Sequence, residues 1–138
     1  MIKKIDKNNV AQIYEIEKEN FKDSEQYKNI ESLLDNKNYL IVGNFIKDKL
    51  ISYIIGIDLN EEYELLKIAT REEYKNKKFA TNLFNHIAKQ YKKIFLEVNK
   101  NNSIAIKFYK GLGFSKIGER KSYYGNNEDA INLVFEHH

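Results

Sequence analysis

The clearest indication of the fold is the sequence Ile68-Ala69-Thr70-Arg71-Glu72-Glu73-Tyr74-Lys75-Asn76-Lys77-Lys78-Phe79-Ala80-Thr81. It begins at the end of a strand-like run, passes through a basic loop and ends in a helical pattern. The first N–H groups of a helix lack internal partners and lie at the positive end of its dipole, so such a junction can bind a pyrophosphate. Lys75, Lys77 and Lys78 add positive charge. On its own, a lysine-rich loop is more often a solvated surface than a phosphate site, so the flanking sequence has to show which of the two it is.

The sequence before this junction predicts four strands and two helices. Val10, Ile13 and Ile16 recur at helical spacing after the capping residues Asn8-Asn9, and a weaker helical pattern runs over residues 24–34. Runs rich in β-branched and aromatic residues predict the strands 1–5, 39–45, 50–59 and 62–70.

The sequence after the junction predicts two helices that alternate with strands. Apolar residues recur at three- and four-residue steps from Lys78 to Tyr91, and we expect this helix to be the longest. Asn102 can cap a second helix that ends at Gly111 and Gly113. The predicted strands are 94–98, 114–122 and 129–135. The element order β-α-α-β-β-β-α-β-α-β-β indicates a mixed α/β sheet.

Composition narrows the class of protein. The 138 residues fit one domain, expected over 1–136, and we interpret His137-His138 as what remains of a purification tag. The absence of cysteine excludes disulfides, a thiolate nucleophile and a cysteine metal site, and we expect no metal. The charge of +3 is spread along the chain, and no apolar run reaches the roughly 20 residues of a membrane span. We therefore expect a cytoplasmic protein that binds neither nucleic acid nor membrane.

Two groups of residues resemble the GNAT superfamily of acetyltransferases. Tyr74-Lys75-Asn76-Lys77-Lys78-Phe79-Ala80 lies where this family carries its Q/R-x-x-G-x-G/A pyrophosphate loop. Leu96-Glu97-Val98, followed by Asn102, Ala105, Phe108-Tyr109 and Leu112-Gly113-Phe114, is similar to its next strand and helix. The resemblance covers about half of the chain. It implies the GNAT fold, an α/β fold whose mixed, mostly antiparallel twisted sheet of about seven strands is flanked by about four helices.

A narrower set of residues resembles the RimI branch of that family, which acetylates the N-terminal alanine of a small-subunit ribosomal protein. The set adds residues 99–101, Ala105-Ile106, Arg120-Lys121-Ser122-Tyr123-Tyr124 and Glu128-Asp129-Ala130. It implies an N-acetyltransferase that moves acetyl from acetyl-CoA to the α-amino group of a protein or peptide. The oligomeric state stays open.

The resemblance also implies roles for individual residues. Glu97 would be the base that frees the amine lone pair, and Tyr109 the acid that protonates the leaving thiolate. Tyr123, Tyr124 and Glu128 would bind the acceptor. The residues expected to bind the cofactor are Ile68, Ala69, Thr70, Lys75, Asn76, Lys77, Lys78, Phe79, Ala80, Thr81 and Asn102. The backbone N–H groups of Ile68-Ala69-Thr70 would also stabilise the oxyanion.

Strand alternation gives Glu97 its expected surroundings. Ile94, Leu96 and Val98 point to one face of the strand while Phe95 and Glu97 point to the other. We expect apolar neighbours whose partial burial of the carboxyl raises its pKa. Without the family match, Glu97 would be interpreted as a surface glutamate.

The sequence departs from the family pattern at three places. Lys75 replaces the usual Gln or Arg, Lys78 replaces the central Gly, and Phe21-Lys22-Asp23-Ser24-Glu25 lacks the Pro and Trp of an F-P-W-S-E-like segment. A Cβ at position 78 either tolerates the required backbone angles or weakens cofactor binding. Two alternatives stay open. One is an acetyltransferase for a polyamine, an aminoglycoside or an amino acid, and the other is a non-catalytic acyl-CoA-binding module.

Overall fold

The computed structural model describes residues 1–125 and 128–137. Asn126 and Asn127, which separate the last two predicted strands in the sequence, and His138 of the expected tag remnant lie outside the described residues. The described elements follow the predicted order: β1 (Ile2–Lys4), η1 (Lys7–Asn9), α1 (Val10–Asn20), α2 (Tyr27–Asp35), β2 (Tyr39–Ile46), β3 (Lys49–Leu59), β4 (Glu62–Thr70), η2 (Glu72–Tyr74), α3 (Phe79–Ala88), β5 (Lys93–Asn99), α4 (Ser103–Leu112), β6 (Ser115–Arg120) and β7 (Ala130–Glu136).

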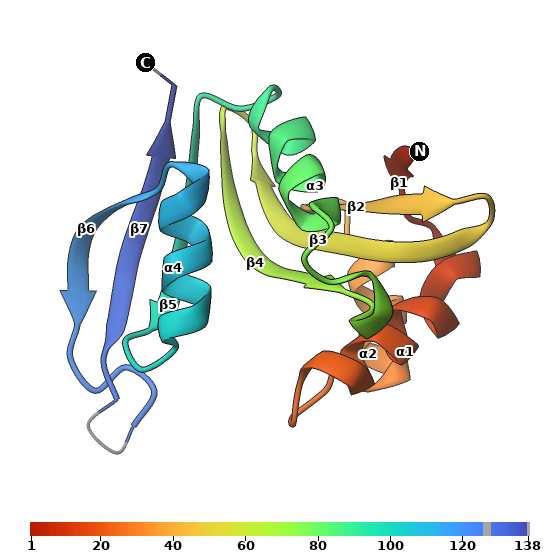
Figure 1. Cartoon of the computed structure of the whole chain (residues 1–138), viewed down its shortest axis with the longest axis horizontal. Coiled ribbons are helices and arrows are strands. Elements are labelled where there is room, and N and C mark those ends of the chain that lie inside the picture. The colour runs from red at the N-terminus through yellow and green to blue at the C-terminus, as the bar shows by residue number, and fades with distance from the viewer. Residues whose placement is uncertain (126–127, 138) are drawn as a thin grey trace.

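The strands form one seven-stranded sheet in the order β1-β2-β3-β4-β5-β7-β6. Neighbouring strands pair antiparallel except β4 and β5, which pair in parallel. The crossover helix α3 connects these two strands along the chain. Figure 1 shows the twisted sheet with its helices. The predicted fold class, a mixed and mostly antiparallel sheet with flanking helices, is confirmed.

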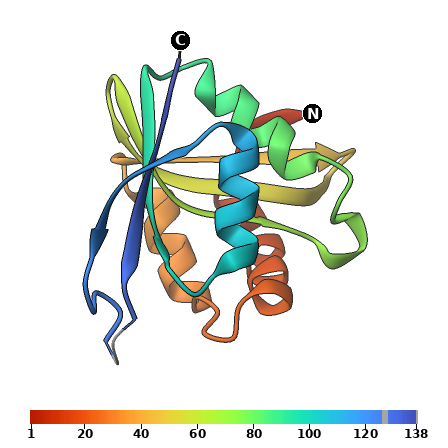
Figure 2. The same ribbon diagram turned by 60° about the vertical axis from the view of Figure 1, so that its left-hand side comes forward.

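Two hydrophobic clusters cover the two faces of the sheet. The first contains Leu83 and Phe84 of α3, with residues of α4 packed against it. The second contains Ile13 and Ile16 of α1 and Ile30 of α2. Alternate residues of the central strands enter different clusters, as expected for strands buried on both sides. Figure 2 shows α3 and α4 on one side of the sheet and α1 and α2 on the other. None of the helices in the described part of the chain combines the length and apolar character needed to cross a membrane.

One expected helix is shorter than its apolar pattern predicts. Helix α3 ends at Ala88 and has 10 residues, so the 11-residue α1 is longer. Tyr91 is nevertheless buried, because it packs on Tyr63 at 5.1 Å between ring centroids and donates a hydrogen bond to Asp58. Tyr91 therefore continues the apolar pattern because it is buried, although the helix has already ended.

A bulge bends β4 at the position where the sheet opens. Gly56 of β3 pairs with Leu65 and Ile55 pairs with Lys67, so Leu66 is an extra residue on β4. Such a bulge bends its strand and increases its twist. A Cβ on Gly56 would lie 2.1 Å from the ring of Tyr63, which explains the glycine at this position.

Beyond the bulge, β4 and β5 separate. They pair only from Glu62 to Glu64 on β4 and from Lys93 to Phe95 on β5, and their later residues run apart (Figure 1). The resulting gap lies between β4, which carries Ile68, Ala69 and Thr70, and β5, which carries Glu97.

Candidate active site

A cavity of about 440 Å³ lies beside this gap, between the end of β4, the loop before α3 and helix α4. Eleven of the predicted cofactor-binding and catalytic residues line it: Ile68, Ala69, Thr70, Lys75, Asn76, Lys78, Phe79, Ala80, Thr81, Asn102 and Tyr109. Two others, Lys77 and Glu97, are not among its lining residues. The structure therefore brings a strand end, a basic loop and a helix face to one hollow.

The loop before α3 reaches its shape through two residues with positive φ. Asn76 has φ +63° and Lys78 has φ +69°, both in the left-handed region. This region costs a non-glycine residue about 1–2 kcal/mol. The first helical N–H with a carbonyl partner is that of Asn82, which donates to Lys78 O at 2.9 Å. The N–H groups of residues 79–81 therefore point out of the helix end, as an anion site requires.

The three loop lysines contribute differently. Lys78 lines the cavity as the N-cap of α3. Lys75 also lines the cavity, but its ammonium forms an ion pair with Glu72 at 2.8 Å. Lys77 lies over the ring of Tyr74 at 5.7 Å. The cavity thus has two cationic side chains beside the N-terminus of α3, a donor set that fits a pyrophosphate.

The backbone of β4 offers hydrogen-bond donors on the gap side. The N–H of Arg71 donates to Ile51 O on β3, and Ala69 pairs with Tyr53 in the same register. Because adjacent residues of a strand direct their N–H groups to opposite sides, those of Ile68 and Thr70 face the gap. Of the three residues expected to supply N–H groups there, two are oriented to do so.

Helix α4 supplies Asn102 and Tyr109. The Oδ1 atom of Asn102 accepts a hydrogen bond from the N–H of Ala105 at 3.2 Å, so this residue caps the helix and lines the cavity. The ring of Tyr109 packs against those of Phe108 and Phe114, 5.5 and 5.6 Å away. Burial raises the pKa of the Tyr109 phenol to about 12. At neutral pH it is protonated and can act as a proton donor.

Glu97 lies on the other face of the sheet. Its neighbours Leu96 and Val98 are buried in the cluster under α3 and α4, so the Glu97 side chain projects to the opposite side. Its side chain is 28% exposed, and its Oε1 atom lies 2.9 Å from Nη1 of Arg120. The carboxylate therefore contacts a cation, in contrast to the apolar surroundings expected from the sequence. Strand alternation placed Glu97 on this face but could not show that β6 brings a guanidinium to it.

The predicted acceptor-binding residues lie around the same carboxylate. The guanidinium of Arg120 packs over the ring of Tyr123 at 4.1 Å. Burial, together with the charge of Glu97, raises the pKa of Tyr124. Glu128 accepts a hydrogen bond from Asn99, two residues after Glu97 on β5. Tyr123, Tyr124 and Glu128 thus gather at the end of β5, on the face opposite the cofactor cavity.

Several residues that the sequence did not predict to bind the cofactor also line the cavity. Asn20, Phe21, Tyr74 and Ile104 line the cavity. Asn20 donates from Nδ2 to Thr70 O at 2.9 Å, which joins the end of α1 to the end of β4. This contact spans 50 residues and no local pattern signals it. Phe21 belongs to the segment that was compared with the family's F-P-W-S-E-like segment, and in the structure it borders the cofactor cavity.

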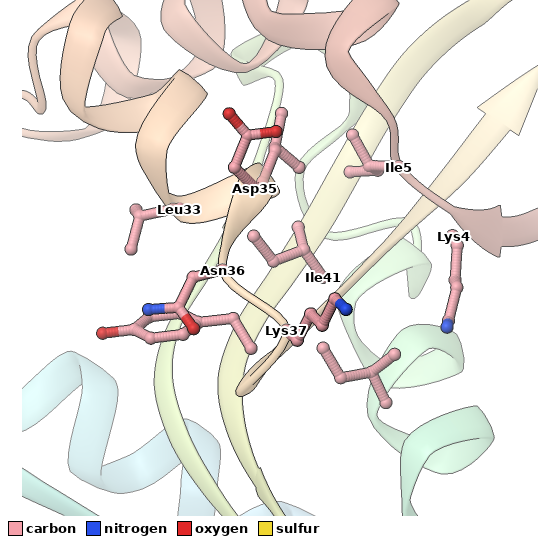
Figure 3. A pocket seen from close by; sticks show the side chains of 10 residues that line it. Lys4, Ile5, Leu33, Asp35, Asn36, Lys37 and Ile41 are labelled. Atoms are coloured by element: carbon pink, nitrogen blue, oxygen red, sulfur yellow. The ribbon is translucent and has the colours of Figure 1, made fainter.

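Another cavity, of about 360 Å³, lies away from these residues. Figure 3 shows that side chains of β1, α2 and β2 line it, among them Lys4, Leu33 and Ile41. Asp35 at its edge forms an ion pair with Lys7 at 2.8 Å. None of the predicted site residues lines this cavity.

Comparisons with known proteins agree with this geometry. A ribosomal protein bS18 alanine N-acetyltransferase of Haemophilus ducreyi is 32% identical over 72% of this chain and 77% of its own. The Escherichia coli ribosomal-protein-S18-alanine N-acetyltransferase superposes with a TM-score of 0.86 at 23% identity, over 99% of this chain and 92% of that one. An aminoglycoside 6'-N-acetyltransferase of Enterococcus faecium shares the fold, with a TM-score of 0.82 at 16% identity over 99% and 96% of the two chains. Residues 8–114 match the profile of the acetyltransferase (GNAT) family, and the chain belongs to this family.

Proposed function

We propose that residues 1–136 act as one domain that transfers an acetyl group from acetyl-CoA to the N-terminal α-amino group of a protein. One observation carries the proposal. Tyr109 and Glu97 lie on opposite faces of the sheet, at the gap where β4 and β5 separate. A donor and an acceptor can therefore approach from opposite sides and meet between the strands. The 32% identical relative, named for alanine N-acetylation of ribosomal protein bS18, supports a ribosomal protein as the acceptor.

The residues on the α3 and α4 side would hold the cofactor. Acetyl-CoA supplies an acetyl group activated as a thioester. The N-terminus of α3, with Lys75 and Lys78, would bind the pyrophosphate through N–H groups and positive charge. The N–H groups of Ile68 and Thr70 would donate to acetyl and pantetheine oxygens along the open side of β4.

Glu97 would accept the proton of the acceptor ammonium. An α-amino group has a reference pKa of about 7.7–8.0 and is largely protonated at neutral pH, so a base has to free its lone pair. The carboxylate lies on the face that the cofactor cavity leaves open, beside Tyr123 and Tyr124. These aromatic rings would form one wall for the incoming chain, with Glu128 adding negative charge near its ammonium group.

Tyr109 would return a proton to the departing thiolate. Its phenol is protonated at neutral pH, as a tyrosine with the ordinary pKa of about 10 also is, and burial raises its pKa further to about 12. Its position on the cavity side, opposite Glu97, separates the group that gives a proton from the group that takes one. This separation supports the assignment of the two residues as base and acid.

Acetyl-CoA consumption tests the proposal directly. The acceptors are short peptides that begin with Ala, spermidine and an aminoglycoside. We expect turnover of the Ala peptides, with kcat reduced by about 100-fold or more in both Glu97→Gln and Tyr109→Phe. Activity on the small amines alone would instead assign the chain to small-molecule acetylation. Binding of acetyl-CoA without turnover of any acceptor would indicate a non-catalytic module.

Glu64→Gln is a matched control for Glu97→Gln. Glu64 borders the same groove as Glu97, on the neighbouring strand, and its change removes the same charge. We expect kcat within about twofold of the unmodified protein, because general-base catalysis depends on reach to the proton and not on charge alone.

A further inference from the structure

Glu17 of α1 is a buried carboxylate that the proposed reaction does not use. Its side chain is 1% exposed. It accepts hydrogen bonds from the hydroxyl of Tyr53, from Nζ of Lys67 at 3.0 Å and from the backbone N–H of Glu25 at 3.0 Å. These three donors belong to β3, to β4 and to the connection between α1 and α2. One side chain thus joins three separate segments to the helix that carries it.

Stability alone gives little reason for a carboxylate at this position. A buried charge loses its hydration, and replacing a buried ion pair by apolar residues of similar volume is often neutral or stabilising. What an apolar residue could not provide is the bond to the N–H of Glu25. This bond joins the connection after α1 to the same carboxylate oxygen that accepts from Lys67 of β4.

The same connection borders two cavities. Phe21 lines the cofactor cavity, and the ammonium of Lys67 lies over its ring at 4.5 Å. Glu17, Glu25 and Lys67 also line a cavity of about 210 Å³ whose remaining walls are largely apolar. Figure 1 shows the connection between α1 and α2 at the end of the molecule toward which β4 and β5 diverge.

Lys67 and Glu97 face the same side of the sheet, on the two strands that border the gap. Lys67 lies opposite Ile55, which belongs to the cluster under α1 and α2, and Glu97 projects away from the cluster under α3 and α4. An acceptor that reaches Glu97 therefore passes along the face to which Glu17 and Lys67 fasten the connection.

We propose that Glu17 is a positioning residue, which holds the connection between α1 and α2 against β4 as a fixed wall for the acceptor. The inference rests on the proposed function. It assigns to Glu17 an effect on acceptor binding that is separate from acetyl-CoA binding and from the proton transfers.

The test compares two replacements of Glu17. Glu17→Gln keeps an oxygen that accepts from Glu25 and an amide of the same shape. Glu17→Leu combined with Tyr53→Phe removes the tether without leaving the tyrosine hydroxyl buried and unpaired, while Lys67, 27% exposed, can turn to solvent. Tyr53→Phe alone is the matched control. The measurements are KM for an Ala peptide and for acetyl-CoA, kcat, thermal unfolding, and hydrogen exchange of the amides in residues 21–26.

We expect the double variant to raise KM for the peptide by about tenfold, the scale of one lost hydrogen bond to a charged group, with KM for acetyl-CoA unchanged. Hydrogen exchange over residues 21–26 should be faster in the double variant than in the unmodified protein. Glu17→Gln should keep both the peptide KM and the exchange rates of the unmodified protein. An unchanged peptide KM in the folded double variant would overturn the inference, as would parallel changes in both KM values. If the unmodified protein acetylates none of the acceptors, the proposed function fails and the inference with it. The exchange rates would then show separately whether Glu17 fixes the connection.

Discussion

The guanidinium of Arg120 and the carboxylate of Glu97 form an ion pair across β6 and β5, with 2.9 Å between Nη1 and Oε1. The same guanidinium packs over the ring of Tyr123. A cation therefore already occupies the side of Glu97 on which we place the acceptor. An incoming ammonium group has to compete with Arg120 for the carboxylate.

Replacing Arg120 by Gln should therefore improve acceptor binding. An exposed ion pair contributes about 0.2–1 kcal/mol, so its removal should lower the acceptor KM by up to about fivefold. The measurement is the KM for an Ala peptide at fixed, saturating acetyl-CoA. Lys121→Gln removes an equal charge from the next residue, which pairs with Glu119 and Asp129 instead, and should leave KM unchanged. A higher KM in Arg120→Gln would mean that the guanidinium binds the acceptor.

Lys78→Gly tests the backbone of the loop before α3. Glycine adopts the observed φ of +69° without steric cost, and we expect the free energy of unfolding to rise by about 1 kcal/mol or less. The ammonium is lost, so KM for acetyl-CoA should rise a few-fold. Thermal unfolding and initial rates measure the two effects. Lys77→Gly is the control, because Lys77 is outside the positive-φ residues and does not line the cavity. There we expect lower stability and an unchanged KM.

Asn102→Ala should weaken the N-terminus of α4. The side chain accepts from the N–H of Ala105, and loss of such a cap costs about 1 kcal/mol. Since Asn102 also lines the cofactor cavity, we expect a higher KM for acetyl-CoA along with a lower melting temperature. Asn101→Ala changes the preceding residue, whose side chain does not cap the helix, and should alter neither property. Equal effects of both substitutions would contradict a specific role for Asn102.

The sequence predicted the element order because each element carries its own periodic pattern and most connections are marked by polar turns. It misplaced the end of α3 because Tyr91 is buried by Tyr63 beyond the helix, and burial and helical periodicity leave the same apolar signal. The sequence left open whether Lys78 adopts the backbone angles that a glycine would adopt at this position, since a lysine gives no local indication of positive φ. In the structure it adopts the left-handed conformation.

Contacts between distant segments could not be predicted from local patterns. The bond between Asn20 and Thr70 spans 50 residues, and the ion pair between Glu97 and Arg120 depends on β7 lying between β5 and β6 in the sheet. Glu17 shows the same limitation. It is buried on α1 together with Val10, Ile13 and Ile16, but its three partners come from elements whose packing no single segment specifies.

Alkaline pH should reveal the environment of Tyr109. Its pKa in the folded protein is about 12, while an unfolded tyrosine has a pKa of about 10. The raised pKa contributes stability that is fully present below about pH 10 and is lost as the pH rises through about 12. Burial also raises the pKa values of Tyr53, Tyr63 and Tyr91, so stability should fall steeply over this range. The difference in tyrosinate absorbance between the unmodified protein and Tyr109→Phe should give the Tyr109 titration. A midpoint near 10 would contradict the burial of the Tyr109 phenol.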